Sequence, residues 1–302
     1  MRWDTGRISR PVNQRRSAVR LVRGGHNPGR IPTMNTPTSI TEILGRSEQG
    51  TTRPFVCRDD TGRTWYVKGA YAGLRSLSCE WVAHRLAWQV LSGYLPGVPE
   101  FRMAEVPDAL ITGSERPDAH ELGGGLVFAS LKIEGGQELH WAAAQGWPEE
   151  TMAMILLLDL WLQNEDRSLS ALGGNPNLLV TQIPTGPAGS HNRALTQEKP
   201  GRRKLWAYDF NLAFDEDFSR ERFFGAHVFG GALWQWPEGF RERMEPRLRA
   251  ALDEVGTIFA ELPLEWLYVD GDDSLPVQLD REKVVSALEL PFTEPANFWN
   301  LP

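Results

Sequence analysis

The sequence predicts an α+β fold in two lobes, in which a small antiparallel sheet with one helix precedes a larger, mainly helical part. Three β-rich runs within residues 40–69 predict the sheet, and an apolar stripe at helical spacing over Leu77–Leu91 predicts its helix. Helical patterns dominate the second half. We therefore divide the chain into a basic, disordered extension at 1–36, an N-terminal lobe at 37–135 and a C-terminal lobe at 136–302.

Charge is unevenly distributed along the 302 residues. Residues 1–33 carry eight arginines and one acid, Asp4, for a net charge of +7, which leaves −14 for residues 34–302 out of the total of −7. The basic head lacks apolar periodicity, so we expect it to be disordered, or an upstream extension with Met34 as the true start. A mitochondrial-type presequence is less favoured because the segment has no amphipathic face. The acidic body argues against direct nucleic-acid binding.

Cysteine content and hydropathy bear on the cellular setting. Two cysteines, Cys57 and Cys79, make no disulfide framework and fit a reduced cytoplasm. No apolar run reaches the ~18 residues that a membrane span needs, because Asp159 interrupts the longest one, Met152–Leu162. The sequence thus predicts a soluble, cytoplasmic protein without membrane contact.

The loop at 45–53, between the first two β-rich runs, resembles a phosphate-binding loop in composition. Gly45 and Gly50 bracket most of it, and Ser47 and Thr51 supply hydroxyls. Backbone N–H groups in such a loop can bind the phosphates of a nucleotide. A plain hairpin connector is the open alternative.

Lys68 ends the third β-rich run, and strand alternation places it on one face with Tyr66, opposite Trp65 and Val67. A strand lysine followed by a helix glutamate, here Glu80, is the pair that holds nucleotide phosphates in kinases. Two plainer interpretations stay open. The lysine can be a surface residue with a buried stem, and the glutamate can be a first-turn acid that complements the helix dipole.

The central stretch, Leu156–Val180, has the order helix, carboxylate loop, asparagine and short strand. A helical pattern at 149–162 leads into Asp166, the expected proton acceptor for a substrate hydroxyl. Asn175 and Asn177 follow, and each is a candidate metal ligand. Asn177 is favoured because it directly precedes an apolar run.

A predicted strand at 204–210 carries a second carboxylate, Asp209, near its end. Carboxylate and amide oxygens suit Mg²⁺, and a lysine suits the phosphates of ATP. We therefore expect ATP and Mg²⁺ as cofactors, with Lys68 as a second catalytic residue. Glu80, Asn177 and Asp209 complete the nucleotide site, and Asp209 with either asparagine is the expected metal site.

The remaining segments are assigned by pattern alone. Residues 107–124 are polar and loop-like, and 181–203 predict an exposed hairpin excursion. Pro246 predicts a break or kink in a long C-terminal helix. Strands are predicted at 100–106 and 125–133, and helices at 229–236, 237–262 and 279–288.

At three places the sequence resembles HipA-like kinases, a bacterial branch of the atypical protein kinases. The motifs are Asn164-x-Asp166-Arg167 with Asn175-Pro176-Asn177-Leu178-Leu179, Leu205-Trp206-x-x-Asp209 with Leu212-Ala213-Phe214, and Tyr66-Val67-Lys68-Gly69. They cover roughly residues 40–215. The resemblance implies a bilobal protein-kinase-like fold and an ATP-dependent Ser/Thr protein kinase, with Asp166 catalytic and Asp209 on the metal. It also implies a protein substrate and an antitoxin-like partner, as in toxin-antitoxin systems.

Two departures from the kinase pattern are visible. Kinases place the metal-binding Asn about five residues after the catalytic Asp, whereas Asn175 and Asn177 lie nine and eleven residues after Asp166. Part of 168–174 therefore reads as an insertion. Asp209 is followed by Phe-Asn where many kinases have Phe-Gly.

Two other functions stay open alongside an active Ser/Thr kinase. The chain can be a pseudokinase-like module that binds proteins, or a kinase for a small molecule or lipid, because the same site can phosphorylate any hydroxyl that fits. Three charged groups expected at one site, Lys68, Asp166 and Asp209, favour an active enzyme.

Overall fold

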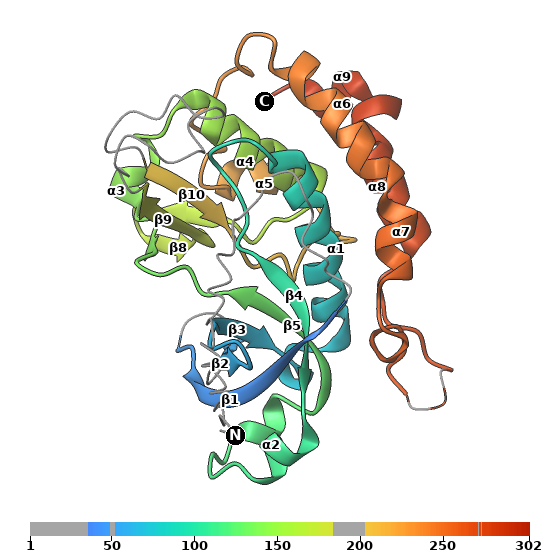
Figure 1. Cartoon of the computed structure of the whole chain (residues 1–302). Helices are drawn as coiled ribbons and strands as arrows, with labels where there is room; N and C mark the ends of the chain where they lie inside the picture. The colour runs from blue at the N-terminus through green and yellow to red at the C-terminus, as the bar shows by residue number, and fades with distance from the viewer. Residues whose placement is uncertain (1–35, 49–51, 184–202, 271, 273) are drawn as a thin grey trace, which may run out of the picture. The chain divides into compact units, whose positions relative to one another are not determined.

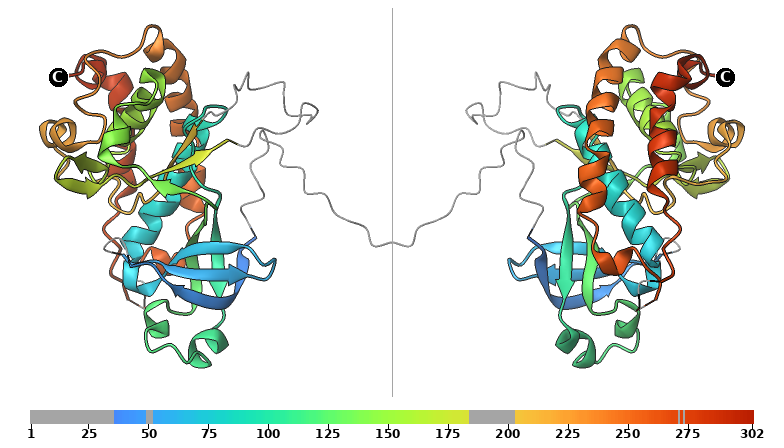
Figure 2. Two further views of the ribbon diagram at one scale, coloured as in Figure 1. Left: turned by 90° about the vertical axis from the view of Figure 1, so that its left-hand side faces the viewer. Right: turned by 90° about the vertical axis from the view of Figure 1, so that its right-hand side faces the viewer.

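A computed structural model describes residues 36–48, 52–183, 203–270, 272 and 274–302. Five strands close into a barrel in the order β1-β2-β3-β5-β4, which is drawn in blue to green in Figures 1 and 2. The β1–β4 pair is parallel and the other pairs are antiparallel. The predicted strands are confirmed, with small shifts of their ends. They are β1 Thr38–Arg46, β2 Phe55–Asp59, β3 Thr64–Lys68, β4 Phe101–Val106 and β5 Gly125–Leu131.

Asp59 fixes the turn between β2 and β3. Its carboxylate accepts hydrogen bonds from the backbone N–H groups of Thr61 and Arg63, at 3.0 and 2.8 Å, and from the Trp65 indole at 2.8 Å. Burial alone would raise the pKa of Asp59, but these hydrogen bonds outweigh it and hold the pKa below its ordinary value. Gly62 completes the turn at a φ of +82°, a conformation that glycine adopts without strain.

Helix α1, Leu74–Leu91, begins three residues before the apolar stripe seen in the sequence. A short 3₁₀ turn, η1 at Ala70–Ala72, connects it to β3. Glu80 therefore lies a turn further into the helix than expected, and its side chain is fully buried. The interpretation of Glu80 as a first-turn acid is wrong, because the first turn of α1 contains no acidic residue.

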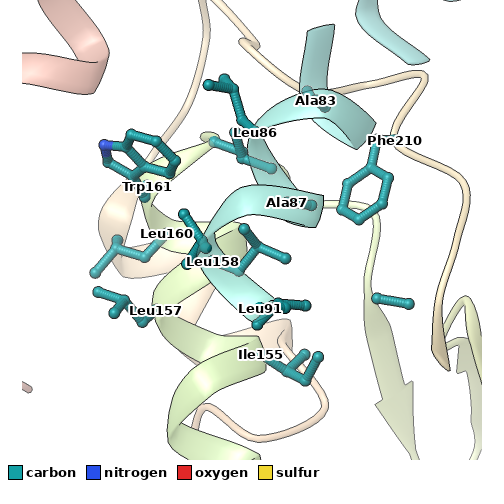
Figure 3. Packing of buried hydrophobic residues seen from close by; sticks show 14 of the residues in the cluster. Ala83, Leu86, Ala87, Leu91, Ile155, Leu157, Leu158, Leu160, Trp161 and Phe210 are labelled. Carbon is teal, nitrogen blue, oxygen red and sulfur yellow. The ribbon is translucent and has the colours of Figure 1, made fainter. Parts of the chain in front are cut away.

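Helix α4, Glu149–Trp161, packs against α1 in the main core. Figure 3 shows Ala87 and Leu91 of α1 beside Leu158 of α4. Every residue of α4 from 151 to 161 is buried, as expected for a helix that is apolar on nearly all sides. Within the described ranges, no helix is both long enough and apolar enough to cross a lipid bilayer.

Two small sheets contain the strands that follow α4, and one of them also includes β6, which precedes α4. In one, β9 pairs with β6 and β10, and in the other β7 and β8 form a hairpin between Asp166 and Asn177. The strand predicted at 204–210 ends at Ala207, so Asp209 follows the strand instead of lying in it. The loop of the predicted hairpin, residues 184–202, lies outside the described residues. The strands are β6 Gln137–Glu138, β7 Ser168–Ser170, β8 Gly173–Asn175, β9 Leu178–Gln182 and β10 Arg203–Ala207.

Helices make up most of the chain after β10. The segment predicted as one helix at 237–262 divides at Glu254 into two, and Pro246 lies inside the first without ending it. The helix predicted at 279–288 is confirmed with a later start and end. The C-terminal elements are α5 Arg220–Ala226, α6 Phe240–Asp253, α7 Val255–Ala260, η3 Leu264–Trp266, α8 Arg281–Thr293 and α9 Pro295–Trp299.

Two predicted segments have a different structure. Residues 107–124 contain α2, Asp108–Thr112, and a 3₁₀ turn, η2 at Ala119–Glu121, instead of a continuous loop. Residues 229–236 form turns instead of a helix. The Gly230 backbone lies directly against a carbonyl group of α5, where a Cβ atom would approach to 2.2 Å, and this close contact replaces helical packing. A further short helix, α3, spans Trp141–Ala144.

Gly69→Ala is expected to lower the free energy of unfolding by about 3 kcal/mol. A Cβ atom at Gly69 would lie 1.9 Å from the Leu122 carbonyl oxygen, which also accepts the N–H of Ala70 at 2.9 Å. Urea denaturation measures the change. Gly45→Ala is the matched control, because a Cβ there meets nothing within 4 Å. Equal stability of the two variants would contradict the close approach of the backbone at Gly69.

Candidate active site

Lys68 occupies the last position of β3, opposite Phe128 on β5. Trp65 and Val67 are buried in the barrel core, whereas Tyr66 and Lys68 line a cleft. The alternation predicted for this strand is therefore observed.

The Lys68 ammonium lies between two carboxylates, with Nζ 2.5 Å from Glu80 Oε1 and 2.5 Å from Asp209 Oδ1. Only 7% of Lys68 and none of Glu80 is exposed. Burial alone would lower the pKa of Lys68, but Asp209 and Glu80 outweigh it and hold the pKa above its ordinary value. Burial alone would raise the pKa of Glu80, but Lys68 and His84 hold it well below its ordinary value. Lys68 and Glu80 are therefore both charged at neutral pH.

The second carboxylate oxygen of Glu80 connects α1 to the segment after β10. It accepts the backbone N–H of Phe210 at 3.0 Å, and His84 Nδ1 lies 3.1 Å from it. The His84 ring packs against the rings of Phe128 and Phe210. One buried carboxylate thus holds both the lysine of the barrel and the residue that follows Asp209.

Asp209 has a φ of +60°, a left-handed conformation that costs roughly 1–2 kcal/mol for a non-glycine residue. Burial raises its pKa against the opposing effect of Lys68, and repulsion from Glu80 adds to the rise. The surroundings of Asp209 thus disfavour its negative charge, and an added cation would relieve this.

Asp166 lies on the loop after α4 and accepts a hydrogen bond from Nδ2 of Asn177 at 2.8 Å. Burial, and then the charge of Asp209, raise the pKa of Asp166, so the two carboxylates lie within electrostatic reach of each other. Asn177 is 2% exposed. Because its nitrogen donates to Asp166, its side-chain oxygen is the atom that remains to accept a hydrogen bond or bind a cation.

A cleft of about 840 Å³, including space open to solvent, lies beside these residues. Apolar side chains from β5, the segment after it and β9 line it together with polar side chains predicted from the sequence. Asp166, the predicted proton acceptor, does not line the cleft itself, but it is hydrogen-bonded to Asn177, which does. The apolar residues are Phe128, Leu131, Ile133 and Leu179, and the predicted polar residues are Ser47, Lys68, Glu80, Asn175, Asn177 and Asp209.

The predicted glycine loop contributes to this cleft only in part. Ser47 lines the cleft, and its N–H donates to the Pro54 carbonyl at 2.8 Å. Gly45 does not line it, because it lies within β1 and pairs there with Val56. Residues 50 and 51, predicted as Gly50 and Thr51 of the nucleotide site, lie outside the described residues.

Arg167 was part of the motif but had no role assigned from the sequence. Its side chain is fully buried, its Nε donates to Asp159 at 2.6 Å, and its Nη1 donates to the backbone carbonyls of Asn177 and Tyr208. One guanidinium thus ties the Asp166 loop to the candidate metal asparagine and to the residue before Asp209.

Asp159 is the shared acceptor of this buried network. It also accepts hydrogen bonds from His227 Nε2 at 3.1 Å and from Asn164 Nδ2 at 2.9 Å. Burial lowers the pKa of His227 against the opposing effect of Asp159, so the ring is neutral at pH 7 and donates through Nε2. Asp159 is the one charged residue in the buried stretch 151–161 of α4, and this was a usable sequence signal, because a buried carboxylate needs partners.

The donor set at the cleft fits a hard divalent cation. Mg²⁺ is usually held by one or two carboxylates, with phosphate and water oxygens completing its shell. Asp209 and the side-chain oxygen of Asn177 supply such ligands from two elements, and Asn175 lines the same cleft. In the part of the chain that the structure describes, no cluster of three or more His, Cys, Asp or Glu side chains is arranged around a common point.

Comparison with known proteins gives one finding. A family model described as HipA-like kinase matches residues 40–302, which include the barrel, the cleft and the C-terminal helices. A search among curated proteins found no match.

Wild-type stability is expected to fall between pH 7 and pH 5 in part through His227. The pKa of His227 is lower in the folded chain than its ordinary value of 6.5. Its contribution to the free energy of unfolding is therefore complete above pH 6.5 and is lost as the pH falls below 6.5 toward the folded-state pKa. His227→Gln keeps a donor for Asp159 but does not titrate. Between pH 7 and pH 5, the free energy of unfolding of His227→Gln should therefore fall by about 1 kcal/mol less than that of the wild type. Urea denaturation at both pH values measures this difference.

The matched control for this experiment is His120→Gln, at an exposed histidine of η2. It should keep the wild-type pH dependence. The same pH dependence in His227→Gln and the wild type would rule out the buried, neutral state of His227.

Proposed function

Because the chain belongs to the HipA-like kinase family, we propose that it is an ATP- and Mg²⁺-dependent phosphotransferase that phosphorylates Ser or Thr hydroxyls of a protein. In this proposal the fold is bilobal and protein-kinase-like. The barrel and α1 form the N-terminal lobe, and the elements from β6 onward form the C-terminal lobe. The enzyme acts in the bacterial cytoplasm, in keeping with its reduced, buried cysteines.

The observation that carries the proposal is the position of Lys68 between Glu80 and Asp209 in the cleft. A cationic group held by a helix glutamate is what binding of nucleotide phosphates requires. The apolar lining from Phe128, Leu131 and Leu179 suits a purine ring, which is flat and apolar on both faces. One cleft therefore offers complementary surfaces to both parts of ATP.

In this mechanism the chain positions groups and provides little covalent chemistry. Asp166 accepts the proton of the substrate hydroxyl, and its raised pKa brings it closer to the range of an effective base. Asn177 orients Asp166, and Lys68 binds the phosphates. Asp209 and the oxygen of Asn177 would hold Mg²⁺, which when bound neutralises charge that develops on the transferred phosphoryl group.

Two alternatives use the same fold. A pseudokinase-like binding module would not need such an arrangement of charges, whereas here Lys68 contacts Asp209, Asn177 contacts Asp166, and the charge of Asp209 acts on Asp166. This supports an active enzyme. A small-molecule or lipid kinase would use the same groups, so the acceptor is assigned by the family alone. An antitoxin-like partner protein, with no direct nucleic-acid or membrane contact, is part of the same proposal.

Asp166→Asn is expected to lower the rate of phosphate transfer from ATP by roughly 10²–10⁴-fold, because the amide cannot accept the proton. Incubation with labelled ATP and a cell lysate, followed by phosphoamino-acid analysis, measures both rate and acceptor. Asp253→Asn, at an exposed acid ending α6, is the matched control. Wild-type activity in Asp166→Asn would remove Asp166 as the base, and label on a metabolite or lipid would favour the second alternative.

Mg²⁺-ATP at about 100 times its Kd is expected to stabilise the folded protein by roughly 2.7 kcal/mol, which is a rise of about 5 °C in Tm for a chain of this size. Asp209→Ala should lose this rise because it removes the main candidate metal ligand. Thermal unfolding with and without Mg²⁺-ATP measures it, with Asp253→Asn again as control. No rise in the wild type would favour the binding module.

A further inference from the structure

The face of α1 that points away from the cleft is covered by the C-terminal part of the chain. In the right-hand view of Figure 2 the orange helices lie in front of α1, in agreement with the contacts that α1 makes with α6, α7 and η3. We call residues 255–268, which comprise α7, η3 and the turn after it, the C-terminal clamp.

Glu261, the residue after α7, is the first polar anchor of the clamp on α1. Its two carboxylate oxygens engage two residues one turn apart. Oε2 accepts the Trp81 indole N–H at 3.1 Å, and Oε1 lies 3.0 Å from Arg85 Nη2. Trp81 is 1% exposed and Arg85 is 7% exposed, while Glu261 itself is partly exposed, so the two contacts are partly shielded from water. A charge-assisted contact in such surroundings is stronger than one at the surface.

Trp266 of η3 is the second anchor, and it contacts the barrel as well as the helix. Its indole N–H donates to the Leu126 carbonyl of β5 at 3.0 Å, and its own carbonyl accepts the Ser78 hydroxyl of α1 at 3.4 Å. A hollow lined by Ser78, Leu262 and Trp266 lies beside these contacts. Apolar packing between the clamp and α1 is therefore incomplete there, so the polar contacts contribute a larger share of the attachment of the clamp to α1.

Two further contacts fix the ends of α1. At the start, Arg75 Nη2 donates to the Phe214 carbonyl at 3.0 Å, in the segment that follows Asp209. At the end, Arg247 of α6 donates to the carbonyls of Val90 and Ser92, at 3.0 and 2.9 Å, where a helix leaves its carbonyl groups without partners. The helix is thus held along its length by the rest of the chain.

The position of α1 decides whether Glu80 reaches Lys68, because a helix moves as a rigid element and carries its side chains with it. Glu80 projects from α1 into the cleft, whereas Ser78, Trp81 and Arg85 contact the clamp. A shift of 1–2 Å, of the order seen in helix movements that switch proteins, would break the pair between Glu80 and Lys68.

We propose that the C-terminal clamp sets the position of α1 and thereby holds Lys68 in the orientation that binds nucleotide phosphates, with Glu261 as a positioning residue. The effect on phosphates rests on the proposed function. The effect on α1 does not, so the two can be tested separately.

The position of α1 can be measured without any nucleotide through Cys79, which lies on α1 with its thiol 3.5 Å from the Ala213 carbonyl. Cys79 is fully buried, as is Cys57 in the barrel. In Glu261→Ala, labelling of Cys79 by a thiol reagent should be about tenfold faster, because local opening of α1 exposes it. Mass spectrometry distinguishes the two thiols. Glu265→Ala, at an exposed acid of η3, is the matched control and should label as the wild type does.

Faster labelling of Cys79 alone supports the clamp. Unchanged labelling in Glu261→Ala overturns it. Equal acceleration at Cys57 and Cys79 also overturns it, because Glu261 would then stabilise the whole protein without a specific effect on α1.

The consequence for phosphates is measured by comparing Mg²⁺-ATP with adenosine, which lacks phosphates. Glu261→Ala should weaken ATP binding about tenfold and leave adenosine binding unchanged, and Glu80→Gln should do the same. Because both variants act through Lys68, the double variant should bind ATP no more weakly than Glu80→Gln alone. Additive effects, or equal losses for ATP and adenosine, would show that the clamp does not act through Glu80. Failure of the wild type to bind ATP would refute the proposed function, while the thiol experiment would still decide whether the clamp positions α1.

Discussion

The buried ammonium of Lys68 between two carboxylates is the interaction on which the rest of the structure depends. It joins β3 of the barrel, α1 and the segment after β10, which come from three distant parts of the sequence. Removing one partner from a buried ion pair costs roughly 3–5 kcal/mol, because the remaining charge stays buried without compensation. The barrel, α1 and the sheet containing β10 must therefore keep fixed positions relative to one another. The apolar contact between α1 and α4 helps to keep α1 in place.

Two residues that line the cleft have a strained backbone. Asn177 and Asp209 both have positive φ values, of +46° and +60°. Such conformations cost of order 1–3 kcal/mol each and persist only where the surroundings impose them. Here the imposing group is Arg167, whose guanidinium binds the carbonyl of Asn177 and that of the residue before Asp209. Asp159 in turn binds Arg167, so a buried carboxylate of α4 supports the backbone of two residues that line the cleft.

Local patterns in the sequence predicted much of the fold and many of the residues at the cleft. The Asp-Gly turn, the alternation around Lys68 and the helix at 149–162 were each predicted from short-range patterns, and the structure shows all three. The predictions were wrong where contacts between distant parts of the sequence determine the local structure. The 229–236 segment has helical composition, but the close contact of Gly230 with α5 fixes turns there. The role of Arg167 could not be predicted either, because its four acceptor residues lie on three separate segments of the chain.

The β7–β8 hairpin separates Asp166 from Asn177 by ten intervening residues, yet the two side chains share a hydrogen bond. Pairing of Ser168 with Asn175 closes the hairpin at its base, and Gly174 is needed there because a Cβ would lie 2.6 Å from a backbone oxygen. The closed base, together with the contacts of Arg167, holds Asp166 close to Asn177. Residues 170–173, beyond the base, are exposed, so we expect changes in their number to leave both groups in place. The number of residues between them is therefore a poor guide for recognising related sites in other genomes, and the closed base is a better one.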